Sequence, residues 1–456
     1  MRSVLVLAVL LASAAAAAQL KDPVDLALEL DEEAFEDYLD KWLEHEQYRL
    51  PNQSPPTSGG CTFQINKKPE DLGQPQPVYL SGIGTSGVTQ RYLVSYGNTG
   101  QIQLKKGEKV TLACTGPENR QYLKGSNKRQ VAVAECVKNN LVSGTGWLKG
   151  NEAFGKLTCI EHPTPVVQKA KGQCNGNKNT VIAVGFNVNQ VFYPLYISCF
   201  DEQRMEALYV RHVQTHENAV HQTRVARPTW QADSLYPGFN LQNIMKIYSQ
   251  AYQKTELTQV IGDENVKKYL TKTKQRFFAR GHLAAKSDFV FATGQRSTFY
   301  YFNAAPQWQC INGGNWNILE QNLRARIGAA GYNTVVYTGT FGVMQLPDKN
   351  NKLVDIYLAQ GKIPVPRFYY KVVHDVVNGK GTAFITINNP HITLAEAEAT
   401  AREFCDCHCR RRSEDFNWLK WKLNSIDIGY SFCCTVEEFR NKIKHLPSFT
   451  TTGLLV

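Results

Sequence analysis

The pattern of apolar and polar positions changes near residue 200. Between Cys61 and Phe200, apolar residues alternate with polar ones in short runs such as GEKVTLAC, QVAVAECV and TVIAVGFNVNQVFYPLYISCF, separated by Gly and Asn turns. Alternation of this kind, rich in β-branched and aromatic residues, is typical of strands. Residues 59–200 are therefore predicted to form a β-rich N-terminal region.

Beyond residue 200, helical and strand-like patterns are mixed. Helices are predicted near 240–253 and 263–272 and in TLAEAEATAREFC, where Thr393 is well placed to cap the first turn. Strands are predicted at Thr334–Thr338 and in RFYYKVVHDVV and GTAFITINN. The whole pattern predicts an α+β fold with a largely antiparallel sheet flanked by helices, in which residues 201–456 form the larger region.

The N-terminus, MRSVLVLAVLLASAAAAAQL, has the layout of a cleaved secretory signal, assigned to residues 1–18. Arg2 precedes a short apolar run, and small residues follow it. The run is shorter than the ~18 residues that a membrane helix needs, and no later stretch reaches that length. We therefore expect a secreted, extracellular protein that does not associate with a membrane.

Twelve cysteines support an oxidising compartment. An even number favours disulfides, although the sequence leaves their pairing open. The clusters CDCHC (405–409) and CC (433–434) raise zinc as the alternative. Their alternating and adjacent cysteines differ from the usual spacing of zinc sites, so disulfides are the preferred interpretation.

Charge is distributed unevenly along the chain. The formal net charge is +11, but residues 19–60 hold eleven acidic side chains and three basic ones, a balance of −8. The signal contributes +1 through Arg2, which leaves +18 for residues 61–456. So basic a body predicts an anionic partner such as nucleic acid.

The acidic segment, residues 19–58, has a helical pattern. Its apolar positions form one stripe beside a carboxylate face, and RLPNQSPPTSGG follows as a linker. Two interpretations remain open. The segment is either a pro-segment that covers a basic groove until a processing protease removes it, or a helix packed permanently on the body. The stripe consists of Phe35, Tyr38, Leu39, Trp42 and Leu43.

Candidate chemistry concentrates between Ala279 and Arg326. The run NWNILEQNLRAR predicts a helix on which Trp316, Glu320 and Arg324 share one face. A charged pair beside a tryptophan is more typical of a cleft than of a core. Just before it, INGG places Asn312 in a turn, where its side-chain carbonyl can face a ligand.

These groups suit phosphodiester hydrolysis. Arg280 and His282 project to the same side if their segment is extended. A histidine can take a proton from water, Mg²⁺ prefers oxygen ligands such as an amide carbonyl, and arginines bind phosphate. Each group also has a structural alternative: a fold-filling histidine, a surface Glu–Arg pair or an asparagine in a turn.

The same segment resembles the DNA/RNA non-specific endonuclease family, through RGH (280–282), FNAAPQ (302–307) and NGGNWNILEQNLR (312–324). The resemblance implies a ββα-metal nuclease core, in which two strands carry the histidine and a helix carries the metal side. It also implies roles for individual residues: His282 as general base, Asn312 as ligand of Mg²⁺ (with Mn²⁺ as a substitute), Glu320 as a water-holding acid, Arg280 and Arg324 as phosphate binders, and Asn303 and Gln307 on the substrate side.

Further runs, among them TLACTG, PVPRFYYKVV and GYSFCC, resemble the arthropod secreted branch, which includes insect gut double-stranded ribonucleases and crustacean duplex-specific nucleases. The family often has Asp before Arg-Gly-His, whereas this chain has Ala279. A further arginine is expected upstream, and Arg211 is the candidate. The expected function is a secreted, Mg²⁺-dependent endonuclease for double-stranded RNA and DNA, with the gut lumen as one destination. The alternatives are a catalytically silent nucleic-acid-binding or uptake protein and a cationic protein with protein partners.

Overall fold

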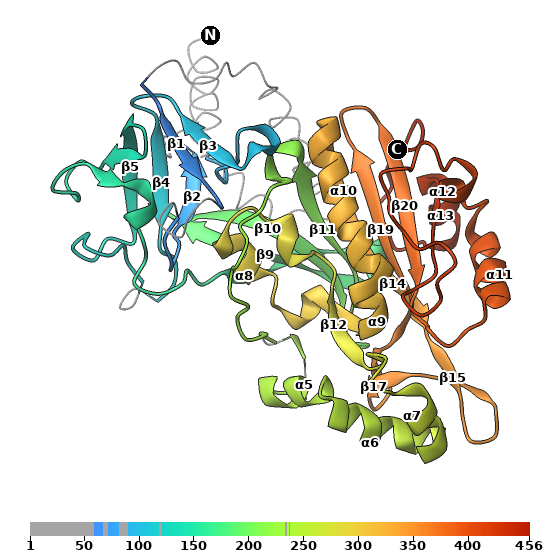
Figure 1. The fold of residues 1–456 in the computed structure, drawn as a ribbon. Coiled ribbons are helices and arrows are strands. Elements are labelled where there is room, and N and C mark those ends of the chain that lie inside the picture. The colour runs from blue at the N-terminus through green and yellow to red at the C-terminus, as the bar shows by residue number, and fades with distance from the viewer. Residues whose placement is uncertain (1–58, 67–71, 82–89, 118–120, 233–234, 237) are drawn as a thin grey trace, which may run out of the picture.

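The computed structural model describes residues 59–66, 72–81, 90–117, 121–232, 235–236 and 238–456 (Figure 1). The expected signal sequence and acidic segment lie outside the described residues. Within the described ranges, no helix combines the length and apolar character needed to cross a membrane. The described residues form two large β-sheets side by side and several two-stranded ones, with helices mainly on the eight-stranded sheet.

The N-terminal region is a small antiparallel β structure. A five-stranded sheet has the order β2-β4-β5-β6-β7, and β1 and β3 form a separate pair. The disulfides Cys61–Cys136 and Cys114–Cys159 tie this region together. The strands are β1 (Cys61–Gln64), β2 (Val78–Ser81), β3 (Gln101–Leu104), β4 (Lys109–Ala113), β5 (Val131–Lys138), β6 (Leu141–Ser143) and β7 (Glu152–Ala153).

The larger sheet has eight antiparallel strands in the order β21-β20-β19-β14-β11-β10-β9-β8, which confirms the predicted α+β fold with a largely antiparallel sheet. The change from one sheet to the other comes before β8, earlier than the expected boundary at residue 200, because alternation alone does not tell which sheet a strand joins. The strands are β8 (Val166–Gln173), β9 (Asn179–Val188), β10 (Val191–Asp201), β11 (Glu206–Thr215), β14 (Asn333–Val343), β19 (Pro366–Asp375), β20 (Lys380–Ile387) and β21 (Ser431–Cys434).

Both faces of this sheet are covered. Helix α10 (Asn317–Ala330) packs on the face that presents Val336 and Val373. Helices α11 (Leu394–Phe404) and α13 (Val436–Lys442) pack on the opposite face. The hydroxyl of Thr393 accepts a hydrogen bond from the Glu396 amide at 3.2 Å, which confirms the predicted cap of α11.

A two-stranded hairpin lies on the α10 side of the sheet. Strand β12 (Phe278–His282) pairs antiparallel with β13 (Ala304–Trp308), and α8 (Ala292–Ser297) lies in their connection. After β13 the chain continues through α9 (Gln309–Ile311) and a π-helical turn, η7 (Asn312–Trp316), into α10. Helices α5 (Leu241–Ile247), α6 (Gln250–Ile261) and α7 (Asp263–Tyr269) form an arm beside the hairpin (Figure 1).

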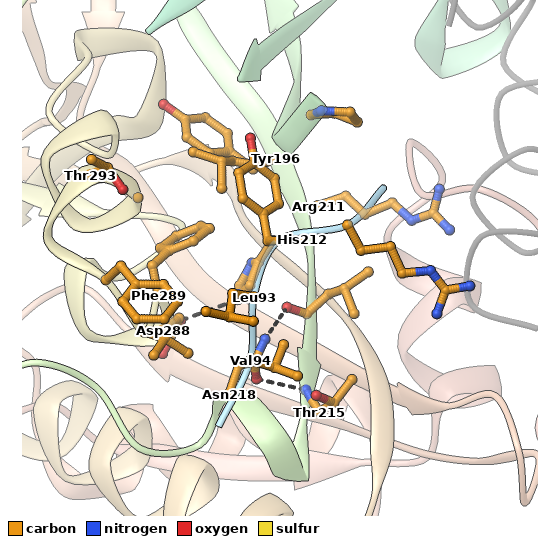
Figure 2. Close-up of a pocket in the computed structure, with 18 of the residues that line it drawn as sticks. Leu93, Val94, Tyr196, Arg211, His212, Thr215, Asn218, Asp288, Phe289 and Thr293 are labelled. Atoms are coloured by element: carbon orange, nitrogen blue, oxygen red, sulfur yellow. Dashed lines mark hydrogen bonds and ion pairs between the residues drawn. The ribbon is translucent and has the colours of Figure 1, made fainter. Parts of the chain in front are cut away.

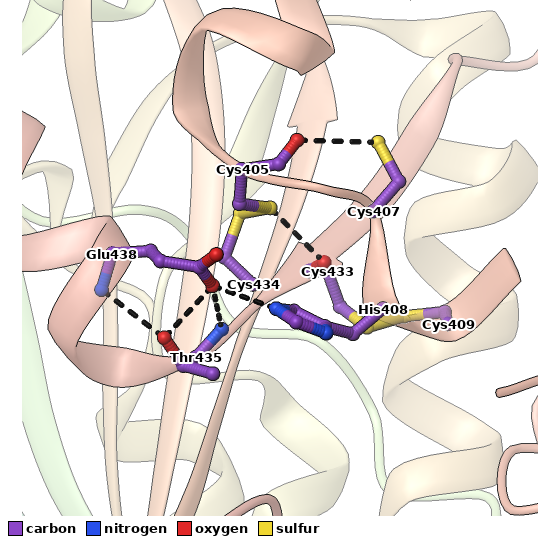
Figure 3. Close-up of a disulfide and its surroundings, with 8 residues drawn as sticks. All are labelled: Cys405, Cys407, His408, Cys409, Cys433, Cys434, Thr435 and Glu438. Atoms are coloured by element: carbon purple, nitrogen blue, oxygen red, sulfur yellow. Dashed lines mark hydrogen bonds and ion pairs between the residues drawn. A yellow bond between two sulfur atoms is a disulfide. The ribbon is translucent and has the colours of Figure 1, made fainter. Parts of the chain in front are cut away.

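Ten of the twelve cysteines form disulfides, as the sequence predicted. Besides the two N-terminal bridges there are Cys174–Cys199, Cys405–Cys434 and Cys409–Cys433. Cys405–Cys434 ties the end of α11 to β21, and Cys409–Cys433 ties α12 (His408–Arg411) to the same strand (Figure 3). Cys310 and Cys407 are free thiols. Four of the five cysteines in CDCHC and CC are paired in disulfides, so the disulfide interpretation replaces the zinc alternative.

Candidate functional site

The Arg-Gly-His sequence forms the end of β12, and its glycine is required by close packing. A Cβ atom at Gly281 would lie 2.7 Å from the Tyr369 hydroxyl and would also overlap the side-chain oxygen of Gln307. Both Gln307 amide atoms are buried and have no hydrogen-bond partner among the described residues. A buried, unpaired amide beneath this strand suits a site that receives an ordered water or a ligand oxygen.

His282 is half-buried among aromatic rings at the end of β12. Its ring centroid is 4.6 Å from that of Trp230 and 5.0 Å from that of Phe299. Its Nε2 is buried without a hydrogen-bond partner in the described part of the chain. Burial, assisted by the positive charges of Arg227 and Lys286, lowers the pKa of His282 to about 3. The ring is therefore neutral near pH 7 and able to accept a proton.

Arg280 lies in an aromatic cage on the same side of β12. Its guanidinium carbon is 5.9 Å from the ring centroid of Trp230, 5.2 Å from that of Tyr248 and 5.5 Å from that of Tyr301. Its Nε donates to the Tyr301 hydroxyl at 3.1 Å, and a terminal nitrogen donates to the Met245 carbonyl at 3.4 Å. Arg280 and His282 both contact Trp230, as expected for residues two apart in a strand.

Asn303 fixes the loop that follows His282. Its side-chain oxygen accepts from the Ala284 amide at 2.8 Å, and its nitrogen donates to the carbonyls of Ala284 and Thr298 at 3.0 and 2.9 Å. The side chain is fully buried. These contacts favour a positioning role for Asn303 over the direct substrate contact expected from the sequence.

Asn312 begins the π-helical turn that precedes α10. Gly314 in this turn has non-helical backbone angles, and a Cβ there would lie 2.6 Å from the Ile428 Cβ. The buried Asn315 holds the turn in place, since its side chain donates to the Lys422 carbonyl at 3.2 Å and accepts from the Lys422 amide at 3.0 Å. Such π-turns inside helices are frequent at functional sites.

The first turns of α10 bring Glu320 beside a buried lysine. Trp316 packs on Tyr369 with ring centroids 5.4 Å apart, and the Lys371 ammonium lies 5.9 Å from the Trp316 ring. Burial raises the pKa of Glu320 to about 7, although Lys371 opposes the shift. Trp316, Glu320 and Arg324 therefore lie on one face of α10, as their spacing predicted, and this face is turned toward the eight-stranded sheet.

Asp288 is the centre of a buried ion cluster. Arg324 donates to its Oδ1 through Nε at 3.2 Å and a terminal nitrogen at 2.8 Å. Its Oδ2 lies 3.3 Å from His212 Nε2 and 3.9 Å from the Lys371 ammonium. Burial alone would raise the pKa of Asp288, but Arg324, His212 and Lys371 together hold it well below its usual range. The aspartate is therefore ionised at any ordinary pH.

Asp288 also connects the histidine side of the site to the helix side. Its charge opposes the fall in the pKa of His282 and adds to the rise in the pKa of Glu320. An aspartate that influences both groups must lie within electrostatic range of both. The structure thus brings the hairpin and α10 together around one carboxylate.

Cations line the hairpin near His282. The Lys286 ammonium donates to the Val225 carbonyl at 2.6 Å. Arg227, which is exposed and lies two residues after Val225, lowers the pKa of both Lys286 and His282 through its positive charge. Arg211, the upstream arginine suggested by the sequence, lies instead over the Tyr337 ring at 5.4 Å. Arg227 is therefore the better candidate for an additional phosphate-binding arginine.

The oxygen donors on the helix side fit a hard divalent cation. The Asn312 amide nitrogen points to the Gln309 side-chain oxygen at 3.4 Å, which directs the Asn312 oxygen elsewhere. Glu320 adds a carboxylate in the same helical run. Mg²⁺ prefers oxygen ligands and keeps several waters, so one amide oxygen and a nearby carboxylate are a suitable protein contribution.

The sequence identified the ends of this site but not its centre. His282, Arg280, Gln307, Asn312, Glu320 and Arg324 lie on the hairpin and helix that the structure joins, and their individual roles remain predictions. Asp288, six residues after His282, was not predicted, because the sequence does not show that Arg324 has a buried charge partner. The other residues not found from sequence are His212, Trp230, Lys371 and Arg227.

Comparison with known proteins identifies the family of the chain. Residues 177–439 match the model of the DNA/RNA non-specific endonuclease family. A salivary endonuclease of Lutzomyia longipalpis is 29% identical over 84% of this chain and 86% of its own length. Salivary protein Tsal1 of Glossina morsitans morsitans is 28% identical over 76% and 83%, and a salivary endonuclease of Culex quinquefasciatus is 25% identical over 63% and 72%. The chain belongs to the DNA/RNA non-specific endonuclease family, in an arthropod branch.

Proposed function

We propose that the protein is a Mg²⁺-dependent endonuclease that hydrolyses the phosphodiester bonds of double-stranded RNA and DNA, with His282 as general base. One observation carries the proposal: Asp288, in the connection that follows His282, binds Arg324 of α10 at 2.8 Å, so a neutral imidazole and a helix bearing oxygen donors meet at one aspartate. A base on one side of a phosphate and an electrophile on the other is the arrangement that water attack requires.

His282 would accept the proton of the attacking water at Nε2, the ring atom without a partner among the described residues. A base with a pKa of about 3 is weak in the free protein. Bound phosphate brings negative charge beside the ring, which raises the pKa of a neighbouring histidine and strengthens it as a base. Substrate binding and base activation are thereby coupled.

Asn312 would hold the metal ion, with Glu320 orienting its waters, and Mn²⁺ could substitute because it also accepts oxygen ligands. The ion, when bound, supplies Lewis-acid stabilisation of the charge that develops on the phosphate and the leaving oxygen. Ionised Glu320 accepts hydrogen bonds from such waters through both oxygens and more strongly than the protonated form, so its pKa of about 7 makes this role dependent on pH.

Arginines would bind the phosphate on both sides of the reacting atom. The Arg324 guanidinium has five N–H donors. Its Nε and one terminal nitrogen each donate to Asp288, so the remaining N–H groups can donate to a substrate oxygen. Arg280 is held by its aromatic cage and by hydrogen bonds to Tyr301 and Met245, which fixes its direction. Arg227 and Lys286 extend the positive charge along the chain of the substrate.

The substrate would be recognised by its backbone. The +18 charge of residues 61–456 supplies attraction to phosphates without reading bases, and the affinity should fall steeply with salt. Five disulfides and the salivary relatives indicate secretion. The gut lumen as destination, and removal of the acidic segment by a processing protease, are part of the proposal.

Incubation of the purified protein with plasmid and long duplex RNA tests this function. We expect fragmentation of both in Mg²⁺, none in EDTA, and recovery when Mg²⁺ is restored in excess. Retention of the duplexes without fragmentation under any metal would instead make the protein a silent nucleic-acid binder. Absence of both retention at low salt and fragmentation would leave the cationic protein with protein partners.

A further inference from the structure

A cavity of about 120 Å³ lies where two strands of the large sheet separate. Strands β10 and β11 pair as far as Tyr196 and His212, and residues 91–94 of the N-terminal region line the space beyond (Figure 2). Asp288 and Phe289 line the side toward the candidate active site. The cavity therefore adjoins the buried ion cluster, and Phe289, Val290 and Phe291 of the connection between the hairpin strands line it.

The lining combines apolar side chains with two guanidinium groups. Leu93 and Phe289 are among the apolar residues, and Arg91 and Arg211 also line the space. Figure 2 shows the Arg211 side chain pointing away from Phe289 and Asp288. An apolar cavity of ~150 Å³ holds a benzene molecule. This one has the size for a single aromatic ring, and its arginines suit carboxylates beside that ring.

We propose that this cavity binds an aromatic side chain of the acidic segment, residues 19–58, whose neighbouring carboxylates pair with Arg91 and Arg211. The segment lies outside the described residues, but its sequence offers Phe35, Tyr38 and Trp42 among carboxylates. Its charge of −8 complements the +18 of the body. Neither arginine needs to be free of other contacts, because each guanidinium has five N–H donors.

The described chain begins within reach of the cavity. Asn66 donates from its side chain to the His221 carbonyl at 2.8 Å, and Thr215 and Asn218, shortly before His221, line the cavity. Between Leu43 and Cys61 the chain can extend over roughly 60 Å. The linker is therefore long enough to let the segment fold back onto this surface.

Docking would regulate the proposed nuclease, a consequence that rests on the proposed function. A bound segment brings its carboxylates next to a body that attracts phosphates, which weakens nucleic-acid binding within about a Debye length, ~8 Å at physiological salt. The docked ring would also contact Asp288 and Phe289, behind the carboxylate that holds Arg324. The docking itself does not depend on nuclease activity.

Trypsin digestion of the full chain tests the docking. Lys41 lies inside the aromatic stripe and Arg49 lies in the linker, so cleavage after Arg49 serves as an internal reference in the same molecule. We expect cleavage after Lys41 to be slower by about tenfold or more than cleavage after Arg49, because a docked segment must open before it is cut. Mass spectrometry of the peptides gives both rates.

Two kinds of variant make the test specific to the cavity. Val94→Trp fills the cavity from the body side, and Phe35→Ser with Tyr38→Ser and Trp42→Ser removes the rings from the segment without touching the described body. Both should raise the Lys41 rate to that of Arg49. The matched control Val377→Trp, at a valine exposed to 44% elsewhere, should leave it slow.

Equal rates at Lys41 and Arg49 in the wild-type chain would overturn the proposal. So would protection of Lys41 that survives Val94→Trp in a folded protein, since the segment would then bind another surface. If Val94→Trp does not fold, the ring-removal variant decides alone. A protein that cleaves no nucleic acid but protects Lys41 would refute the proposed function and support the docking. A protein that cleaves nucleic acid but does not protect Lys41 would support the function and refute the docking.

Discussion

The two faces of the eight-stranded sheet bury different kinds of side chain. The face under α11 and α13 is filled mainly by apolar residues such as Tyr370, Val372 and Ile385, and a disulfide, Cys405–Cys434, reinforces it. The face under α10 buries Asp288 and Lys371 in an ion cluster. Apolar burial stabilises a fold by itself, whereas buried charges lose solvation that their pairing only partly returns. The α10 face therefore adds a buried ion cluster to a large apolar core, whereas the opposite face is mainly apolar.

Replacement of the histidine on the α10 side, compared with replacement of one on the opposite face, should have the largest effect. His282→Ala should lower kcat/KM for duplex RNA by about 10²–10⁴-fold, the usual contribution of a general base, while duplex binding stays largely intact. His374→Ala is the matched control, because His374 lies on the opposite face and stacks on Phe449 at 4.7 Å. Full turnover by His282→Ala, measured as fragment release, would end the assignment.

Removing the central carboxylate should affect stability as well as activity. Asp288→Asn leaves Arg324 and Lys371 buried without their anion, and the expected loss in the free energy of unfolding is about 3–5 kcal/mol. Asp263→Asn removes an exposed partner of Lys267 and should leave the free energy of unfolding nearly unchanged. Urea unfolding curves give both values. Similar losses for the two variants would show that the ion cluster does not hold the α10 face together.

Loosening the π-helical turn should weaken metal binding. Asn315→Ala removes the buried amide that holds this turn to Lys422, at a cost of about 1–3 kcal/mol. We expect the Mg²⁺ concentration for half-maximal activity to rise about tenfold, which 1.4 kcal/mol corresponds to. Asn322→Ala, which removes an exposed hydrogen bond to the Lys420 amide, is the control and should leave it unchanged.

The pH dependence of cleavage should report Glu320 rather than His282. His282, with a pKa of about 3, is neutral throughout the range from pH 5 to 8, whereas Glu320 ionises near pH 7. The rate at subsaturating substrate should rise about tenfold per unit below pH 7 and level off above it. Glu320→Gln should be less active and lose this limb. A limb unchanged in Glu320→Gln would assign it to another group.

The same raised pKa has a consequence for stability. The neutral form of Glu320 is favoured by burial, so its contribution is present below its ordinary value of 4.5 and is lost as the pH rises through about 7. The free energy of unfolding of the wild-type protein should therefore fall between about pH 4.5 and pH 7 relative to that of Glu320→Gln, which urea unfolding at several pH values would measure.

Removal of residues 19–58 should have the smallest effect. We expect cleavage to rise a few-fold at low salt and to converge with that of the full chain at high salt, because the segment acts through screened charge. The matched control keeps residues 19–58 at full length but replaces their acidic side chains by the corresponding amides, so that the segment loses its charge and not its length. Identical rates at low salt would make the segment a helix with no regulatory role.

Local features were predictable from the sequence. The cap of α11 could be predicted because Thr393 directly precedes the helical run, and a cap is decided within one turn. The shared face of Trp316, Glu320 and Arg324 was found for the same reason, since helical spacing fixes it. The hairpin histidine and its following helix were recognised from motif residues that are close together in the chain.

Long-range features were not predictable. Lys371 reaches Asp288 from a strand far along the chain, and nothing in the run RFYYKVV distinguishes this lysine from a surface one. Asn303 matches a motif position, but only its three hydrogen bonds show that its amide is committed to the loop after His282. The placement of β8–β10 in the larger sheet likewise depends on pairing partners that a strand pattern does not name.

The most direct test of the account is a double-mutant cycle between the two sides of the site. Single-turnover cleavage of one duplex RNA in saturating Mg²⁺ would be measured for wild type, His282→Ala, Asn312→Ala and the double variant. Groups that act as a unit are strongly non-additive, so each single variant should lose most of the activity and the double variant little more. Losses that multiply in the double variant, or full turnover by either single one, would show that the histidine and the helix do not act on the same phosphorus.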